Sequence, residues 1–151
     1  MLILDAERLG EHSPWRVHEV ERGAIAKFAR ALQLDNPIHF SPERAHAAGY
    51  RDVVAPPTFV VTLLPWEIPG LTLPEAGVLH GEQEFEWAAP ICAKDEIRVS
   101  GWIEGVKTRT GQQGQMTLIT VASEGINQAG EIAFRARAVL VVTEEVAHAG
   151  G

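Results

Sequence analysis

The sequence predicts a single α+β domain in which an antiparallel sheet wraps around one central, buried helix. Two observations carry this prediction. Segments of the first half have helical spacing, whereas the chain from Val78 onward alternates like a series of strands. Between the two lies a short run from Pro57 to Leu64 that has almost no polar face, and a helix that is apolar all round belongs in a core. A sheet wrapped around that helix accounts for the order of the elements economically.

Length and composition limit the kind of protein. The chain has 151 residues, which fits one domain over 1–151, with its core over about 13–143. Hydrophobic residues make up 46% and charged residues 22%, which is typical of a globular protein. A formal net charge of −7 argues against a nucleic-acid partner. Acidic residues near the start, where a signal peptide carries basic ones, and the lack of a long apolar stretch predict a cytoplasmic protein without a membrane partner.

Helices are expected in the first half of the chain. Apolar side chains recur at i, i+3, i+4 and i+7 over residues 25–32, which predicts an amphipathic helix. That helix should end near Gln33, because the Asp35-Asn36-Pro37 sequence favours a turn. A second, short helix is expected over about 41–49, with a serine as its N-cap and a proline at its first position.

Strands are expected near 15–20 and throughout the second half. Four of them are predicted near 78–89, 95–107, 114–125 and 131–143, separated where Gly, Asn and Gln provide turn chemistry. The last strand places apolar side chains on one face and Arg135 and Arg137 on the other. Helices followed by antiparallel strands around one apolar helix correspond to the hotdog arrangement.

Three motifs lie in the order that this arrangement requires. Asn36-Pro37-Ile38-His39 follows the amphipathic helix, Ala55-Pro56-Pro57-Thr58-Phe59 opens the central helix, and His80-Gly81-Glu82-Gln83 precedes a strand. In these motifs, and over roughly residues 13 to 143, the chain resembles the MaoC-like hotdog dehydratase/hydratase family, in particular its N-terminal dehydratase-domain type.

The resemblance implies an activity on acyl thioesters of coenzyme A or acyl carrier protein. Members of the family add water to trans-2-enoyl thioesters or remove it from 3-hydroxyacyl thioesters, without a metal or redox cofactor. A positioned base is needed for this chemistry because the α-proton is weakly acidic. The negative charge that builds on the thioester oxygen needs preorganised donors, which a helix N-terminus supplies. The resemblance implies two sets of site residues in this chain: catalytic His39, Asp35 and Asn36, and substrate-binding Tyr50, Pro57, Thr58 and Phe59.

Two residues depart from the family pattern. The family aspartate stands two residues before the asparagine, where this chain has Leu34, which cannot accept a proton. Asp35 is adjacent, but it substitutes only if the turn is rebuilt. Catalytic relatives usually have glycine where this chain has Pro57, and proline has no backbone N–H to donate. Both departures affect catalytic elements.

Four functional hypotheses follow. The chain is one subunit of a double-hotdog pair whose partner is a catalytic MaoC-like subunit, or it is a self-sufficient homodimeric hydratase that uses His39. Alternatively, it binds acyl thioesters without turnover. A hotdog thioesterase is a weaker option, because the segment from Pro57 to Leu64 contains no carboxylate. A partner is expected in either enzyme form, because an isolated hotdog sheet has an open edge.

Each candidate residue also has a purely structural interpretation. Asp35-Asn36-Pro37 fits a polar turn, and His39 fits a half-buried histidine near a helix start. His80 and Glu82 share a strand face but have no evident third ligand, so no metal site is predicted. Cys92, the only cysteine, fits packing better than nucleophilic catalysis.

Overall fold

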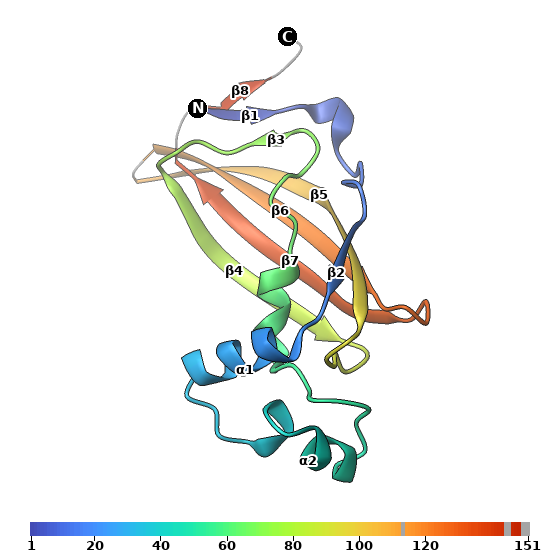
Figure 1. The fold of residues 1–151 in the computed structure, drawn as a ribbon. Coiled ribbons are helices and arrows are strands. Elements are labelled where there is room, and N and C mark those ends of the chain that lie inside the picture. Colours follow the sequence, from blue (N-terminus) through green and yellow to red (C-terminus); the bar gives the residue numbers. More distant parts are fainter. Residues whose placement is uncertain (113, 144–145, 149–151) are drawn as a thin grey trace.

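A five-stranded antiparallel sheet with strand order β2-β5-β6-β7-β4 forms the body of the molecule (Figure 1). The computed structural model describes residues 1–112, 114–143 and 146–148. The strands are β2 (Arg16–Glu19), β4 (Val78–Trp87), β5 (Glu96–Gly111), β6 (Gly114–Ile126) and β7 (Ile132–Val142). Four of them lie within a few residues of the predicted long strands, and β2 coincides with the predicted strand at 15–20. This order makes β2 and β4 the two edges of the sheet.

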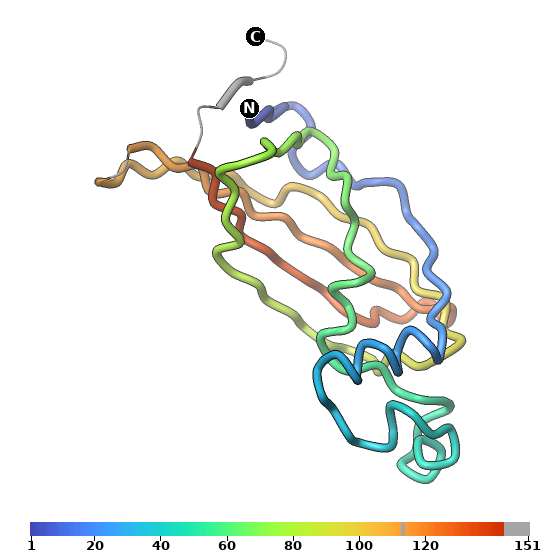
Figure 2. Tube along the Cα trace, turned by 60° about the vertical axis from the view of Figure 1, so that its left-hand side comes forward, coloured from blue at the N-terminus to red at the C-terminus, as the bar shows by residue number. Residues whose placement is uncertain are grey.

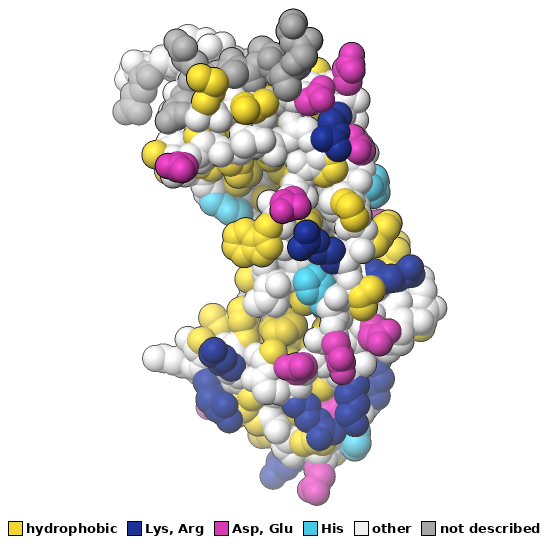
Figure 3. Space-filling view, turned by 45° about the horizontal axis from the view of Figure 1, so that its top comes forward, with side chains coloured by type: hydrophobic (Ala, Val, Ile, Leu, Met, Phe, Trp, Pro, Cys, Tyr) yellow, Lys and Arg dark blue, Asp and Glu magenta, His cyan; other side chains and the backbone are white. Residues whose placement is uncertain are grey.

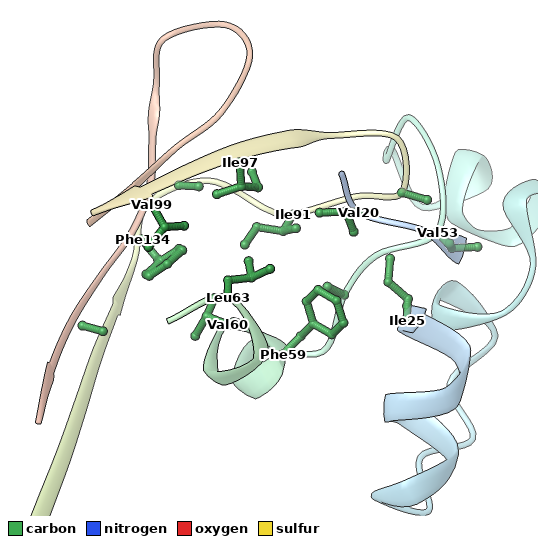
Figure 4. Packing of buried hydrophobic residues seen from close by; sticks show 14 residues of the cluster. Val20, Ile25, Val53, Phe59, Val60, Leu63, Ile91, Ile97, Val99 and Phe134 are labelled. Carbon is green, nitrogen blue, oxygen red and sulfur yellow. The ribbon is translucent and has the colours of Figure 1, made fainter. Parts of the chain in front are cut away.

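The predicted central helix lies across the concave face of this sheet, as Figure 2 shows for the green segment. Its form differs from the expectation, because η3 (Pro57–Leu63) is a short 3₁₀-helix and not an α-helix. It is also not wholly buried, since Val61 is 45% exposed. Its other apolar side chains, Phe59, Val60 and Leu63, point into the core toward Ile91, Ile97, Val99 and Phe134 (Figure 4). The hotdog arrangement is therefore confirmed, with a 3₁₀-helix of seven residues in place of the expected α-helix.

The helical layer lies at one end of the sheet and carries the first motif. It consists of α1 (Arg22–Ala31), η2 (Pro37–His39) and α2 (Pro42–Ala47). As predicted, Ser41 caps α2, because its Oγ accepts the N–H of Arg44 at 3.3 Å. The end of α1 near Gln33 is also confirmed.

A second, smaller sheet was not predicted. It contains β1 (Leu2–Leu4), β3 (Leu71–Thr72) and β8 (Val146–His148), with β1 parallel to β8, and a 3₁₀ turn η1 (Ala6–Arg8) follows β1. In this sheet Ile3 of β1 lies opposite Ala147, and Leu4 lies opposite His148. Leu2 and Leu4 pack into a second core cluster and cover one end of the main sheet.

Candidate active site

His39 lies at the end of η2 and is only 7% exposed. Its Nδ1 atom is 2.6 Å from the carbonyl oxygen of Val54. A carbonyl only accepts hydrogen bonds, so Nδ1 carries the proton in this contact. The second ring nitrogen, Nε2, is then unprotonated in the neutral imidazole and offers a lone pair.

Nε2 has no hydrogen-bond partner among the described residues. Every fully buried side-chain nitrogen or oxygen of those residues has a partner, so Nε2 is not fully buried. An accessible lone pair on an otherwise buried imidazole is the arrangement that a general base requires.

Val54 lies in an extended segment that is hydrogen-bonded on both of its sides. Its N–H donates to the carbonyl of Ile38 at 2.9 Å, so both polar groups of its backbone face the loop that carries His39. The neighbouring groups face the opposite way: the carbonyl of Val53 accepts from Ala93, and the N–H of Ala55 donates to Ile91. This alternation is that of a strand, and it connects the His39 loop to residues 91–93.

Two ion pairs anchor the start of that segment. Asp52, 5% exposed, accepts two hydrogen bonds of 2.9 Å from the guanidinium of Arg22, the first residue of α1. Arg51 reaches the other way and makes the same forked contact with Asp95, which is 1% exposed. Neither ion pair has a local signal in the sequence, because the partners are separated by 30 and 44 residues.

The Arg22 guanidinium lowers the pKa of Asp52 from 3.8 to about 2, and the hydrogen bond from the Val53 N–H acts in the same direction, against the effect of burial. Asp52 is therefore a carboxylate at any pH near neutrality.

The turn between α1 and η2 places the other two predicted catalytic residues away from the His39 ring. α1 ends in a Schellman motif, in which Gln33 has φ of 57° and the N–H of Leu34 bonds back to Ala29. Asn36 is the N-cap of η2, and its Oδ1 accepts the N–H of Ile38 at 3.2 Å. Asp35 is exposed, and among the described residues nothing joins it to His39 by a hydrogen bond.

Leu34, at the position of the family aspartate, is 37% exposed. Because the Schellman motif and the Asn36 cap fix both ends of this turn, Asp35 does not occupy the place of the missing carboxylate.

The start of η3 carries three of the predicted substrate-binding residues. Pro57 and Thr58 are exposed, and the indole N–H of Trp87 donates to the Pro57 carbonyl at 2.8 Å. The N–H of Phe59 donates to the Pro56 carbonyl, and the Phe59 ring packs edge-on against Phe28 in the core. In the described part of the chain no acceptor binds the Thr58 N–H, so this is the donor that η3 leaves available for an oxyanion.

Tyr50, the fourth predicted substrate-binding residue, lies elsewhere. It follows α2 and is half-buried, and its backbone N–H donates to the carbonyl of Ala45. It lies four residues before Val54 in the chain, and among the described residues no hydrogen bond joins its side chain to η3. The structure thus brings His39 and Val54 together but places Tyr50 in the helical layer.

Two hollows adjoin η3. One of about 300 Å³ lies at its start, between residues 54–57 and 87–91. A larger one of about 440 Å³ lies at its end, between the helix and the open side of the sheet. Apolar side chains line most of the larger hollow, and its polar members are His80, Gln83 and Ser123. Figure 3 shows hydrophobic side chains in the recessed waist of the molecule, and Lys and Arg side chains at its helical end.

Other candidates are structural. Arg135 pairs with Glu124, and Arg137 pairs with Glu84 and Glu104 on the outer face of the sheet. Burial raises the pKa of the Cys92 thiol, which is inaccessible and thus not nucleophilic. Within the described ranges there is no group of three or more side chains that could hold a metal ion. The helices of those ranges include none long and apolar enough to cross a membrane.

Comparison with known proteins identifies the family. A family described as "FAS1-like, dehydratase domain region" matches residues 9–136. The UPF0336 protein of Saccharopolyspora erythraea is 39% identical over 145 residues, which cover 91% of this chain and 90% of that protein. A UPF0336 protein of Streptomyces avermitilis is 34% identical over 155 residues, with 98% and 97% covered.

Solved structures agree in fold. A chain of the C-terminally truncated HadBC complex of Mycobacterium tuberculosis, a 3R-hydroxyacyl-ACP dehydratase, superposes with a TM-score of 0.70 at 26% identity, covering 86% of this chain and 92% of that one. The R-hydratase PhaJ1 of Pseudomonas aeruginosa gives 0.70 at 16% identity, with 96% and 90% covered. The solved structures show that the chain shares the fold of MaoC-like dehydratases and hydratases. The match over residues 9–136 and the relatives show that it belongs to the FAS1-like dehydratase domain family.

Proposed function

We propose that the chain hydrates trans-2-enoyl thioesters, or dehydrates 3-hydroxyacyl thioesters, as one subunit of a double-hotdog pair. The observation that carries this proposal is the hydrogen bond from Nδ1 of His39 to the Val54 carbonyl, because it leaves Nε2 free as a base. The similar HadBC complex is named a 3R-hydroxyacyl-ACP dehydratase, and the similar PhaJ1 protein is named an R-hydratase.

In the hydration direction, Nε2 of His39 accepts a proton from a water molecule while the water oxygen attacks C3 of the enoyl thioester. Negative charge moves to the thioester oxygen, which the Thr58 N–H stabilises. The imidazolium then returns the proton to C2, so that the elements of water are added and the base is regenerated. Dehydration is the reverse sequence.

The acyl chain fits the larger hollow at the end of η3. Its volume of about 440 Å³ and its largely apolar lining suit a hydrocarbon chain. Trp66, 95% exposed, lines it and is well placed to cover an extended ligand.

A partner subunit is part of the proposal for two reasons. The chain lacks a carboxylate at Leu34 and an N–H at Pro57, so its own site is incomplete. Edge strand β4 presents exposed Leu79 and Trp87 and has one unpaired side. Pairing at β4 would continue the sheet into the partner. The similar solved chains include members of two-component complexes, HadBC and ChsH1-ChsH2.

The first experiment measures hydration of trans-2-enoyl-CoA esters by the purified chain, alone and after mixing with a catalytic MaoC-like subunit. His39→Ala is the test variant, and His12→Ala, which removes a histidine on the outer side of the sheet, is the control. Turnover that depends on His39 but not on His12 supports the proposal. Turnover unaffected by His39→Ala, in either setting, would refute it.

A second candidate function is a binding half without chemistry of its own. The observation that favours it is the absence of two catalytic groups, at Leu34 and Pro57, on otherwise intact architecture. In that case acyl-CoA binds to the chain with unchanged affinity in His39→Ala, and turnover of the pair depends on the partner's residues alone.

A further inference from the structure

We infer that Asp52 and Asp95 are positioning residues, which hold the Val54 carbonyl against His39. They thereby keep the imidazole in the tautomer that carries its proton on Nδ1 and leaves the lone pair on Nε2. The inference rests on the proposed function, because it assigns these carboxylates a role only if His39 is the base. Neither residue belongs to the family motifs, and neither touches the His39 ring.

The position of one carbonyl oxygen decides the protonation pattern of His39. A neutral imidazole has two tautomers, and the hydrogen bond to the Val54 carbonyl selects the one with its proton on Nδ1. If that oxygen moves away, the proton can reside on Nε2, and the lone pair that faces solvent is lost. A displacement of about 1 Å is enough to affect catalysis severely.

The Val54 carbonyl belongs to a segment with few constraints of its own. Val54 makes an isolated bridge with Cys92 and is not part of the main sheet. Its own N–H and the groups on either side bind only to two loops, at Ile38 and at residues 91–93. The position of the segment therefore depends on the positions of those two loops and of its own first residues.

The two ion pairs fix the position of the first residues of the segment. Arg51 and Asp52 are adjacent in the chain but reach in opposite directions, to Asp95 and to Arg22. A forked guanidinium–carboxylate contact fixes both distance and orientation. Together the two forks hold the start of the segment against α1 on one side and against the turn before β5 on the other.

Asp95 also fixes the second loop. Its Oδ2 accepts the Cys92 N–H at 2.9 Å, and its Oδ1 accepts from the side chain of Gln128 at 3.0 Å. The loop at 91–93, to which Val53 and Ala55 are bonded, is thereby tied to the same carboxylate that holds Arg51. The Asp95 carboxylate thus fixes the position of Arg51, at the start of the segment, relative to the loop at 91–93.

The test reads the tautomer directly. Nitrogen-15 NMR of the full chain, with labelled histidine, distinguishes protonated from unprotonated ring nitrogens of His39. In the wild type we expect a protonated Nδ1 and an unprotonated Nε2 at a pH where the ring is neutral. In Asp52→Asn we expect a mixture of the two tautomers, and kcat for enoyl-thioester hydration at least about tenfold lower, with KM within about twofold.

Two further variants keep the test decisive. Arg22→Lys retains the charge but not the fork, and it replaces a half-exposed residue, so it serves if Asp52→Asn does not fold. Glu104→Gln is the matched control, because it breaks a similar fork with Arg137 on the outer face of the sheet. We expect the tautomer shift in Arg22→Lys and none in Glu104→Gln.

Unchanged His39 resonances in both Asp52→Asn and Arg22→Lys would overturn the inference, even if activity fell, because the role would then be merely structural. A wild-type chain that shows the expected tautomer but no His39-dependent turnover, with or without a partner, would instead refute the proposed function. The two failures are distinguishable because the tautomer is measured without substrate.

Discussion

The ion pair between Arg22 and Asp52 predicts a particular dependence of stability on pH. The perturbation is Asp52→Asn, which removes the charge while keeping an oxygen that can accept the Val53 N–H. In the native chain the Arg22 guanidinium lowers the pKa of Asp52 from 3.8 to about 2. The unfolded chain has no such partner, so its carboxyl titrates near 3.8.

The magnitude follows from that difference in pKa. Each pKa unit corresponds to about 1.4 kcal/mol, which gives roughly 2 kcal/mol as an upper value for the stabilisation. Because the Arg22 side chain is 52% exposed and water screens the pair, we expect about 1–2 kcal/mol. Between the two pKa values the unfolded state binds a proton that the native state does not. The stabilisation is therefore complete above about pH 4 and is lost as pH falls toward about 2.

The assay is urea denaturation of the wild type and of Asp52→Asn at several pH values from neutral to acid. We expect the difference in unfolding free energy to be about 1–2 kcal/mol at neutral pH and to shrink steadily below about pH 4. Glu104→Gln, which removes an exposed pair, should cost less than about 1 kcal/mol. A cost for Asp52→Asn that does not shrink in acid, or that equals the cost of the control, would refute the reasoning.

Three other substitutions test the fold and the site. In Gly125→Ala the new Cβ would lie 2.2 Å from the buried ring of Phe134, so we expect denaturant melts to show a free energy of unfolding lower by about 1–3 kcal/mol. An unchanged free energy of unfolding would contradict the packing described. Ser41→Ala removes the cap of α2 and should cost about 1 kcal/mol in the same melts, whereas Ser41→Asp should retain most of the stability. Leu34→Asp combined with Pro57→Gly should raise hydratase turnover at least tenfold, since one oxyanion donor alone is worth about 100- to 1000-fold; no gain would mean that the deficit in the site lies elsewhere.

The long strands could be predicted because their signals are local. The first residues of β5 alternate between exposed and buried side chains, and Gly111 pairs with Gly114 at the tip of the β5–β6 hairpin. The turn before β7 is closed by Asn127, whose side chain accepts two backbone N–H groups, and by Gly130 with φ of 79°. Alternation and turn chemistry together specify strand and register without knowledge of the rest of the chain.

The form of η3 could not be predicted in the same way. An apolar run of seven residues has no periodicity long enough to separate an α-helix from a 3₁₀-helix. Proline at Pro57 and again at Pro65 leaves room for about two turns. The exposure of Val61 follows from the open side of the sheet, where a hollow adjoins η3, and this is a property of the tertiary structure.

The parts of the site that were not predicted depend on contacts over long distances in the chain. The resemblance implied that Asp35 and Asn36 work with His39, yet Asn36 caps η2 and Asp35 is exposed. The groups that do support His39 are Val54, 15 residues away, and the ion pairs of Asp52 and Asp95. The family motif points to His39 as the candidate base, but the contacts that hold His39 come from segments distant in the sequence.

The structure of this support favours a catalytic role over a role in packing. A histidine that only fills space in a core needs partners for both ring nitrogens, because an unpaired buried polar atom costs about 1–3 kcal/mol. In His39 one nitrogen is bonded at 2.6 Å, whereas the other has no hydrogen-bond partner among the described residues and is not fully buried. In the proposed function, a partner subunit that pairs at β4 supplies the groups that this chain lacks at Leu34 and Pro57. The contacts of His39 fit that proposal, because they leave one ring nitrogen available in a site that two subunits would share.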